Sequence, residues 1–450
     1  MAITDAQPGS AAPPPSFAEA FRVWLKIGLI NFGGPAGQIA LMHRILVDEK
    51  RWIDETRFLH ALNYCMLLPG PEAMQLATYV GWLMHGTRGG LAAGVLFILP
   101  GFIVILALSM AYALLGDLPL VQGILFGLKA AVLAIVAEAL VRVSKRALKG
   151  PAAVAIAIAA FAAIAFLAVP FPLIIVAVAA IGVLLYWRGT GSRSTASEER
   201  TRGENAAAPM ARTPWAQSSR AVLLWGAIWL ATVALLIAVL GLRHVFTEEA
   251  LFFSKVAVVT FGGAYAVLAY VAQQAVEAYG WLRPDEMLTG LGLAETTPGP
   301  LILVLVFVGF LAGFRGQTGL DPLSAGIVGS LVTLWVTFVP SFLFIFAGAP
   351  FIEHLRGNHA LAGALAAVTA AVVGVIANLA LWFGLHVLFA EVGEAAYGPL
   401  TVPVPDPKTF DWAAGLIALA ATVALLRFHV GVITLLVCAA LAGAALRLLA

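Results

Sequence analysis

The chain alternates long apolar runs with short stretches that are polar or rich in glycine and proline. A run of about 20 apolar residues has the length of a membrane-spanning helix. Continuous spans are predicted at Leu91–Leu115, Leu120–Val141, Ala152–Val169, Phe171–Trp187, Ala221–Leu240, Leu323–Gly348, Leu361–Val387, Trp412–Leu426 and Val430–Leu449. Four further runs are interrupted by glycine or proline, namely Phe17–Val47, Thr56–His85, Ala250–Tyr279 and Glu286–Gly313. The pattern predicts an all-α polytopic membrane protein with broken or re-entrant helices at its core.

The interrupted runs occur as two copies of one pattern. Each copy contains a lysine, a Phe-Gly-Gly triplet, a tryptophan and a Pro-Gly-Pro triplet, and a constant offset of 229 residues separates the copies (26 to 255, 69 to 298). The paired positions are Lys26 and Lys255, Phe32-Gly33-Gly34 and Phe261-Gly262-Gly263, Trp52 and Trp281, and Pro69-Gly70-Pro71 and Pro298-Gly299-Pro300. Such spacing indicates an internal duplication. In a membrane protein, matched interruptions in two halves point to a transport site.

The two copies are expected to have opposite orientations in the membrane. An odd number of predicted spans precedes the second copy, so it should begin on the other side. Short cytoplasmic loops collect Lys and Arg. The first copy carries Arg44, Lys50, Arg51 and Arg57 after its first broken run, whereas the equivalent stretch of the second copy has only Arg283. Both observations predict two inverted-topology repeats.

The same patterns divide the chain into parts. We expect a disordered tail (1–16), a first transporter repeat with a trailing hairpin (17–188), a polar linker (189–219), an extra transmembrane span (220–241), a second, inverted transporter repeat (250–390) and a C-terminal transmembrane hairpin (410–450). The tail has no basic start followed by an apolar core, so it is not a signal peptide.

The Gly-Gly breaks are predicted to bind an anion. A helix that restarts after a break leaves N–H groups without partners at the positive end of its dipole, and this combination binds anions. Proline suits the first turn of such a helix. The alternative is that the glycines only let two helices pack closely. The candidate substrate-binding residues around these breaks are Lys26, Asn31, Phe32, Gly33, Gly34, Pro35 and Gln38 in the first copy, and Lys255, Thr260, Gly262 and Gly263 in the second.

The Pro-Gly-Pro triplets must also interrupt a helix, because each removes two backbone donors. Non-helical backbone at membrane depth survives only where it is buried in protein or lines a wet cavity. We therefore expect re-entrant tips facing the transport pathway, and an ordinary loop between short spans is the alternative. The candidate residues are Pro69, Gly70 and Pro71, and Thr297, Pro298, Gly299 and Pro300.

Three carboxylates are candidates for proton coupling, because intramembrane acidic residues often carry protons. Glu72 follows the first Pro-Gly-Pro, Glu295 precedes the second, and Glu138 lies within a predicted span. For Glu138, an ion pair with Lys129 that only orients helices is an equal alternative.

Composition narrows the class of protein. The chain has 450 residues, of which 61% are hydrophobic and 11% charged, far from the roughly 25% charged residues of a soluble domain. A net charge of +2 gives no indication of nucleic-acid binding, and two cysteines within apolar runs indicate neither disulfides nor a metal site. The eight histidines show no metal-ligand spacing. No cofactor is expected.

These motifs together resemble the chromate ion transporter family. The resemblance rests on Phe32-Gly33-Gly34-Pro35 with Pro69-Gly70-Pro71, and on Phe261-Gly262-Gly263 with Pro298-Gly299-Pro300. Members of this family are bacterial and archaeal inner-membrane proteins that expel chromate, and some are implicated in sulfate handling. The long form of the family has two fused domains of opposite orientation, which is what this chain looks like. The resemblance implies a multi-pass protein of the bacterial inner membrane that is associated with chromate resistance.

The leading hypothesis is a secondary transporter that exports chromate, bound at half-helix N-termini from both repeats. The lysines Lys26 and Lys255 would offset the two negative charges, so Lys26→Ala should abolish transport. A sulfate or other tetrahedral-oxyanion transporter and a passive anion channel remain alternatives. A membrane enzyme that reduces chromate would need a flavin, a nicotinamide or paired thiols, for which the sequence gives no sign. The expected partners are the oxyanion, the lipid bilayer and, as a homodimer, a second copy of the chain.

Overall fold

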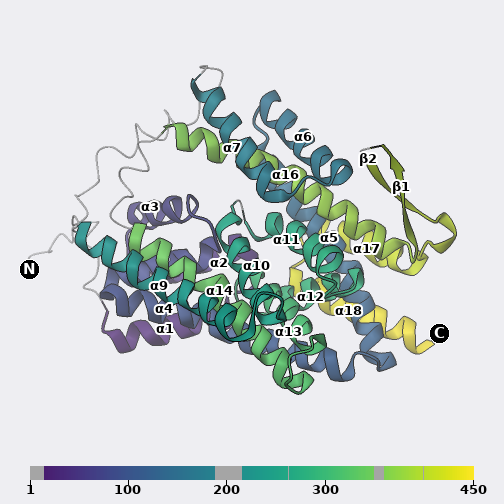
Figure 1. The fold of residues 1–450 in the computed structure, drawn as a ribbon, viewed down its shortest axis with the longest axis horizontal. Helices are drawn as coiled ribbons and strands as arrows, with labels where there is room; N and C mark the ends of the chain where they lie inside the picture. The colour runs from purple at the N-terminus through teal and green to yellow at the C-terminus, as the bar shows by residue number, and fades with distance from the viewer. Residues whose placement is uncertain (1–14, 188–214, 262, 349–358, 399, 450) are drawn as a thin grey trace, which may run out of the picture.

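A computed structural model describes residues 15–187, 215–261, 263–348, 359–398 and 400–449. The described residues are almost entirely helical (Figure 1). Six of their helices are long and apolar enough to cross a membrane, and four shorter ones are apolar as well. The predicted all-α polytopic membrane fold is confirmed. The expected tail, apart from residues 15 and 16, and residues 189–214 of the expected linker lie outside the described residues.

The first repeat contains seven α-helices and one π-helical turn among its described residues. These are α1 (Phe17–Ile30), α2 (Gly34–His43), the π-turn η1 (Arg44–Glu49), α3 (Glu55–Cys65), α4 (Glu72–Leu115), α5 (Pro119–Ala147), α6 (Pro151–Leu167) and α7 (Phe171–Trp187). Local chemistry sets two of the starts. The side chains of Ser16 and Asp54 accept hydrogen bonds from the first turns of α1 and α3, which satisfies donors that a helix start leaves free.

The second repeat follows the same plan after an added helix, α9 (Trp215–Leu240). Its elements are α10 (Val245–Val259), α11 (Ala264–Gln273), the π-turn η2 (Gln274–Ala278), α12 (Pro284–Glu295), the 3₁₀ turn η3 (Leu301–Leu303), α13 (Val304–Arg315), α14 (Pro322–Gly348), α16 (His359–Leu388), α17 (Trp412–Phe428) and α18 (Val432–Leu449). Even the π-helical turn after the first break recurs. The duplication read from the motifs therefore extends to local backbone geometry.

The long helix α4 is two helices that meet at a sharp turn. The backbone leaves helical angles at His85 and Gly86. A side chain at Gly81 would meet the Gly89 carbonyl at 2.5 Å, so the two halves run back along each other. In the second repeat, α13 and α14 form the same hairpin, where Gly309 and Gly329 are in equivalent contact. The turn lies where the sequence predicts the boundary between Thr56–His85 and Leu91–Leu115.

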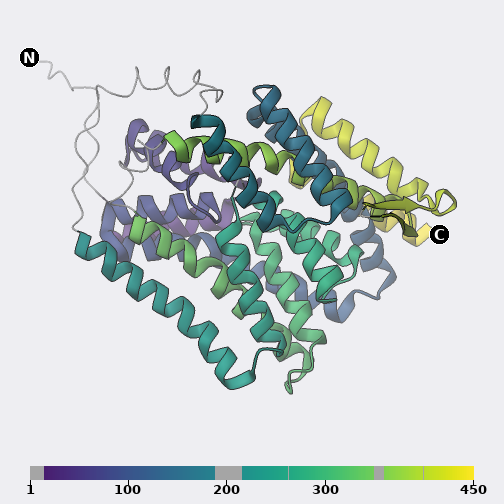
Figure 2. The same ribbon diagram turned by 45° about the horizontal axis from the view of Figure 1, so that its top comes forward.

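The two repeats exchange their trailing hairpins. Helices α6 and α7 of the first repeat pack on α16 of the second, while α17 and α18 of the second pack on α5 of the first. Figures 1 and 2 show α6 and α7 lying along α16 at one end of the molecule, with α17 and α18 beside α5. An exchange in which each copy contacts the equivalent part of the other is the mark of two-fold symmetry.

Two features differ from the sequence prediction. The helix α9 begins at Trp215, so residues 215–219 of the expected linker are helical. A β-hairpin that was not predicted joins α16 to α17, with strands β1 (Val392–Tyr397) and β2 (Leu400–Pro405) paired antiparallel. Three prolines and several small residues hid its alternating pattern. The helix α9 lies along the outside of the molecule (Figure 2) and buries little of its surface.

The hairpin exchange can be tested through the close contact of α5 and α18. A side chain at Gly127 would meet the Ala439 carbonyl at 1.9 Å, whereas one at Gly226 on α9 would meet nothing within 4 Å. We expect Gly127→Leu to lower stability by about 1–3 kcal/mol because the helices must separate. Tryptophan fluorescence during heating in detergent measures the shift. An equal shift in Gly226→Leu would contradict the packing.

Candidate functional site

Four helix breaks, two from each repeat, meet at the centre of the protein. The Gly-Gly breaks lie between α1 and α2 and between α10 and α11. The Pro-Gly-Pro breaks lie between α3 and α4 and between α12 and η3. Each break ends one helix and starts another with changed direction, as the triplets predict. Their non-helical backbone groups need partners, because hydrocarbon offers none.

Those partners come from the other repeat. The Gly70 N–H donates to the Thr260 carbonyl at 2.8 Å, and the Gly299 N–H donates to the Asn31 carbonyl at 3.1 Å. Positions 31 and 260 are equivalent in the duplication, as are 70 and 299. Each Pro-Gly-Pro break is therefore hydrogen-bonded to the Gly-Gly break of the opposite copy. The two bonds join equivalent positions of the two repeats.

Glycine is required at the middle of both Pro-Gly-Pro triplets. Gly70 has φ of +119° and Gly299 has φ of +107°, a backbone conformation that residues with a Cβ rarely adopt. There is also too little space for a side chain at these contacts. A Cβ at position 70 would lie 2.9 Å from the Ser341 hydroxyl, and one at Gly101 would lie 2.0 Å from the Pro298 carbonyl.

These last contacts form a second reciprocal pair. Beyond the hairpin turn the two copies align at an offset of 240 residues, which pairs Ala130-Ala131-Val132 with Ala370-Ala371-Val372. At this offset Pro100-Gly101 within α4 is equivalent to Pro340-Ser341 within α14. Each of these segments packs against the Pro-Gly-Pro break of the other repeat. The site is thus assembled from both copies at once.

Three buried side-chain amides tie the breaks together. Gln38 donates to the carbonyls of Asn31 and Gly299, Gln75 donates to the Pro69 carbonyl at 2.7 Å, and Asn31 donates to the Phe97 carbonyl at 3.4 Å. All three side chains are fully buried, and their amide oxygens have no hydrogen-bond partner among the described residues.

A small cavity lies between the breaks. It measures about 20 Å³, which is room for about one water molecule. Four helix N-termini border it, two from each repeat: α2 at Pro35, α4 at Glu72 and Ala73, α11 at Ala264, and η3 at Leu301 and Ile302. Side-chain caps are absent at these four N-termini. Gln38, Gly70, Pro71, Thr260, Gly263 and Pro300 complete the lining.

The N-terminal ends of four helices border this point, so the positive ends of their dipoles lie close to it. Such a place favours negative charge without any cationic side chain. In this conformation the space is too small for an anion with four oxygens.

The remaining residues of the breaks lie around this cavity without lining it. Phe32, Gly33, Pro69 and Pro298 are part of the non-helical segments, and Gly34 is the first residue of α2. Thr297 is buried and donates to the Leu293 carbonyl of α12. Gly262 lies outside the described residues.

Neither expected lysine reaches the cavity. Lys26 is exposed on α1, whose buried face is formed by Ala20, Val23, Trp24 and Ile27. Lys255 is exposed on α10, and its Nζ lies 5.7 Å from the centre of the Tyr270 ring. Both lysines point to the outside of the protein, where their long side chains can extend to the membrane surface. In this conformation they cannot offset the charges of an anion in the cavity.

The three candidate carboxylates occupy different surroundings. Glu72 lines the cavity at the start of α4. Glu295 is buried and accepts a hydrogen bond from the Tyr265 hydroxyl. Glu138 forms an ion pair with Arg142 at 3.3 Å. The alternative of a pair between Glu138 and Lys129 is wrong, because Lys129 pairs instead with Asp285 of α12 at 3.6 Å.

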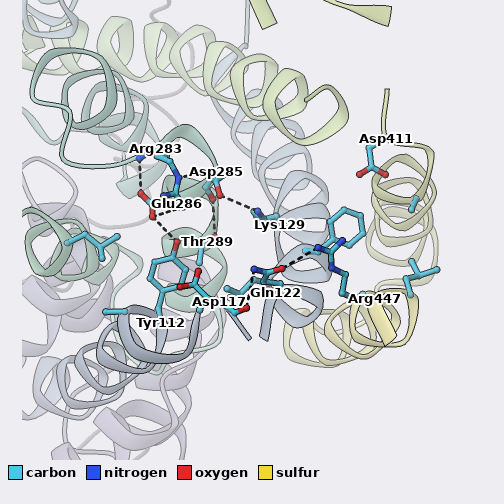
Figure 3. A pocket seen from close by; sticks show the side chains of 18 of the residues that line it. Tyr112, Asp117, Gln122, Lys129, Arg283, Asp285, Glu286, Thr289, Asp411 and Arg447 are labelled. Atoms are coloured by element: carbon cyan, nitrogen blue, oxygen red, sulfur yellow. Dashed lines mark hydrogen bonds and ion pairs between the residues drawn. The ribbon is translucent and has the colours of Figure 1, made fainter. Parts of the chain in front are cut away.

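A second, larger cavity opens at one end of the molecule. It measures about 720 Å³ and is bounded by α4, α5, α12, α13 and α18. Figure 3 shows its charged and polar side chains, which come from both repeats. Its lining carries Lys129, Arg283, Arg315 and Arg447 together with Asp117, Asp285, Glu286 and Asp411. We call this cavity the polar vestibule.

Glu286 is the structural centre of the vestibule. Its side chain is fully buried, and the Arg315 guanidinium donates two hydrogen bonds of 2.6 and 2.7 Å to its carboxylate. The Tyr112 hydroxyl donates to it at 2.8 Å, and the backbone N–H of Arg283 donates at 2.9 Å (Figure 3). Since Tyr112 belongs to α4, this carboxylate joins the two repeats a second time.

Sequence reasoning missed several residues that the tertiary structure brings together. These residues are Gln75, Gly101, Ser341 and Glu286, which lie in or beside segments whose motifs were recognised. Gln75 corresponds to Val304 and Glu286 to Arg57, so neither forms a repeated motif. Gly101 and Ser341 correspond to each other but differ in residue type. Among the described residues, no group of His, Cys, Asp and Glu side chains could hold a metal ion.

Comparison with known proteins extends these observations. Residues 18–183 and 247–444 match the family described as Chromate transporter. The chain is 32% identical to the chromate transport protein of Pseudomonas aeruginosa, over 83% of this chain and 82% of that protein. It is 27% identical to the chromate transport protein of Cupriavidus metallidurans, over 81% and 82%. It is also 27% identical to a probable chromate transport protein of Synechococcus elongatus, over 83% and 86%. No solved structure matches the chain.

The Glu286 network gives a prediction about stability. We expect Glu286→Gln to lower the free energy of unfolding by about 1–3 kcal/mol, because Arg315 loses its charged acceptor in a buried place, although partial exposure of the arginines screens the effect. Asp117→Asn is the matched control, since Asp117 is exposed in the same vestibule. Thermal unfolding in detergent measures both. A Glu286→Gln protein as stable as the control would show that the network is dispensable.

Proposed function

The chain belongs to the chromate transporter family, and we propose that it is a secondary active transporter that exports chromate across the bacterial inner membrane. The family is one of transporters, so the chain is a multi-pass transport protein and not an enzyme. The observation that carries the proposal is the convergence of four uncapped helix N-termini, two from each repeat, on one central cavity. Chromate as the substrate is supported by the names of three relatives.

The oxyanion would be held by backbone donors and amides. Chromate is tetrahedral, so its oxygens can accept from several directions at once. The N-termini of α2, α4, α11 and η3 approach from different sides, and the Gln38 amide at the cavity wall neutralises the carbonyls of Asn31 and Gly299 by donating to both. Because Lys26 and Lys255 lie outside, helix dipoles and N–H groups supply the positive potential.

Transport requires the closed cavity to open toward each side in turn. The two reciprocal bonds, Gly70 to Thr260 and Gly299 to Asn31, are the contacts that opening would loosen. We propose that the repeats are inverted, so that loosening one bond opens one side and loosening the other opens the opposite side. The polar vestibule would be the water-filled approach on one side. Its four basic side chains are balanced by four acidic ones, so the vestibule would admit an anion through its water and not by a net positive charge.

Export of a dianion from a negative-inside cell is assisted by the membrane potential. Each charge gains about 2.3 kcal/mol per 100 mV. A sulfate transporter would use the same groups, and a passive channel would show flux without any coupled ion. Uptake of labelled chromate and labelled sulfate into inside-out vesicles, with and without a proton gradient, separates these functions. If uptake of both anions is no higher than in protein-free vesicles, the proposal is contradicted.

Gln38 tests the site itself. Gln38→Leu keeps the approximate volume but removes the amide that joins Asn31 to Gly299. We expect transport of labelled chromate in vesicles to fall at least about tenfold, since the loss of one such hydrogen-bond donor costs about 1.4 kcal/mol or more. Gln317→Leu, in an exposed turn, is the control and should transport normally. Normal transport by Gln38→Leu would show that this amide does not contribute to the site.

Glu72 tests the electrostatics of the cavity. Its carboxylate lies where the anion would bind, so the two negative charges compete for the same helix N-termini. We expect Glu72→Gln to lower the KM for chromate several-fold and to reduce the dependence of KM on pH. Glu55→Gln, which removes an exposed carboxylate from α3, is the control. A KM raised by Glu72→Gln would mean that the carboxylate assists binding.

A further inference from the structure

A carboxylate that the sequence analysis did not single out is sealed inside the second repeat. Glu249 lies near the start of α10 and is fully buried. Neither of its carboxylate oxygens has a hydrogen-bond partner among the described residues. Burying an ionised carboxylate without a partner is far more costly than burying a neutral one. This side chain therefore needs a proton to remain where it is.

A second unpaired polar group lies close to the Glu249 carboxylate, at the contact between α13 and α14. Glu249 approaches the point where α13 and α14 touch: a Cβ placed on Gly329 would lie 3.0 and 3.2 Å from its two carboxylate oxygens. Thr333 lies one turn further along α14, against Gly309 of α13. The Thr333 hydroxyl is also buried and has no partner among the described residues. Two unpaired oxygen-bearing groups thus border the same helix crossing.

The fold itself does not require polar residues here. The first repeat builds the same crossing with Gly81 and Gly89 in place of Gly309 and Gly329. In that copy the position of Glu249 is taken by Ala20, at the offset of 229, and the position of Thr333 is taken by Ala93, at the offset of 240. Both alanines are buried. The helices pack without the carboxyl and the hydroxyl, so these groups serve something other than packing.

Few charged groups face Glu249. The helix α14 contains no ionisable residue, α9 has only Arg220 at its beginning among its described residues, and α11 has none with a formal charge. On α13 the only charged residue is Arg315, which is engaged with Glu286. On α10 itself the neighbours are Glu248 and Lys255. Lys255 is exposed, and Glu248 carries the same charge as Glu249, so neither supplies a compensating contact.

We propose that Glu249 is the proton-binding site that couples proton movement to oxyanion transport, an inference that rests on the proposed function. A route to water is close, because the adjacent Glu248 lines an open hollow at the end of α10. Loss of the proton leaves a carboxylate that must reach this water. Uptake of a proton from the hollow makes the carboxyl neutral and lets it return to its buried place.

The helix α10 links this site to the anion cavity. Thr260, at the other end of α10, accepts the bond from Gly70, and its carbonyl lies about 16 Å along the helix from Glu249 at 1.5 Å per residue. A shift of α10 that exposes Glu249 therefore also pulls on one of the two reciprocal bonds. Because the first repeat has Ala20 in the equivalent place, one proton per transport cycle is expected to use this site.

The test measures proton and chromate movement together in proteoliposomes with a pH-sensitive dye inside. We expect Glu249→Gln, which imitates the protonated form, to exchange labelled chromate between equal pools at close to the normal rate. The same variant should lose chromate-driven proton flux, with at least about a tenfold decrease. Glu248→Gln, one residue away in the open hollow, should retain both activities.

A second measurement does not depend on transport. Infrared difference spectra of the purified protein across a pH titration should contain the band of a buried protonated carboxyl, and Glu249→Gln should lack it. Thr333→Val, which keeps the shape of the side chain, should shift that band while preserving the fold. The double variant Glu249→Ala with Thr333→Ala copies the first repeat, so it should fold even if Glu249→Gln does not.

The outcomes separate the two proposals. If the wild-type protein exchanges no chromate but shows the carboxyl band that Glu249→Gln removes, the proposed function fails and the proton site stands. If chromate moves and proton flux persists in Glu249→Gln, the coupling role is overturned. Proton flux that survives in Glu249→Gln but disappears in Glu72→Gln would assign the coupling to the cavity carboxylate instead.

Discussion

Unpaired backbone groups at the helix breaks are the constraint on which this structure depends. A membrane interior offers no water to satisfy them, so every break must find its partners within the protein. Here each Pro-Gly-Pro break bonds to the Gly-Gly break of the opposite copy, through Gly70 to Thr260 and through Gly299 to Asn31. One repeat by itself would leave both sets of groups unsatisfied. The need for partners makes the two copies interdependent.

The same constraint explains the position of the proposed anion site. Helices that restart after the breaks direct their free N–H groups toward the shared centre, and glycines allow the backbone to turn there without a side chain in the way. The amides of Gln38 and Gln75 donate to carbonyls of the breaks, and their own oxygens have no partner among the residues that the structure describes. The residues that support the backbone at the breaks are therefore also those of the proposed oxyanion site.

The two copies have diverged in a consistent way. Gln38 and Gln75 belong to the first repeat, and their equivalents in the second are Val267 and Val304. Glu249 and Thr333 belong to the second repeat, where the first has Ala20 and Ala93. Duplication supplied two equal scaffolds. The buried amides of Gln38 and Gln75 lie on one copy and the buried carboxyl of Glu249 on the other, so the two copies differ in the polar groups that they bury.

The sequence by itself determined the membrane fold, the duplication and the places where helices break, because length, hydropathy and the backbone limits of glycine and proline act locally. It could not determine which way Lys26 and Lys255 point, since that depends on which face of α1 and α10 the neighbouring helices cover. The partner of Lys129, the β-hairpin, the Glu286 network and the isolation of Glu249 were likewise decided only by the tertiary structure. Each depends on contacts between residues that are far apart in the chain, and a local sequence pattern carries no information about such contacts.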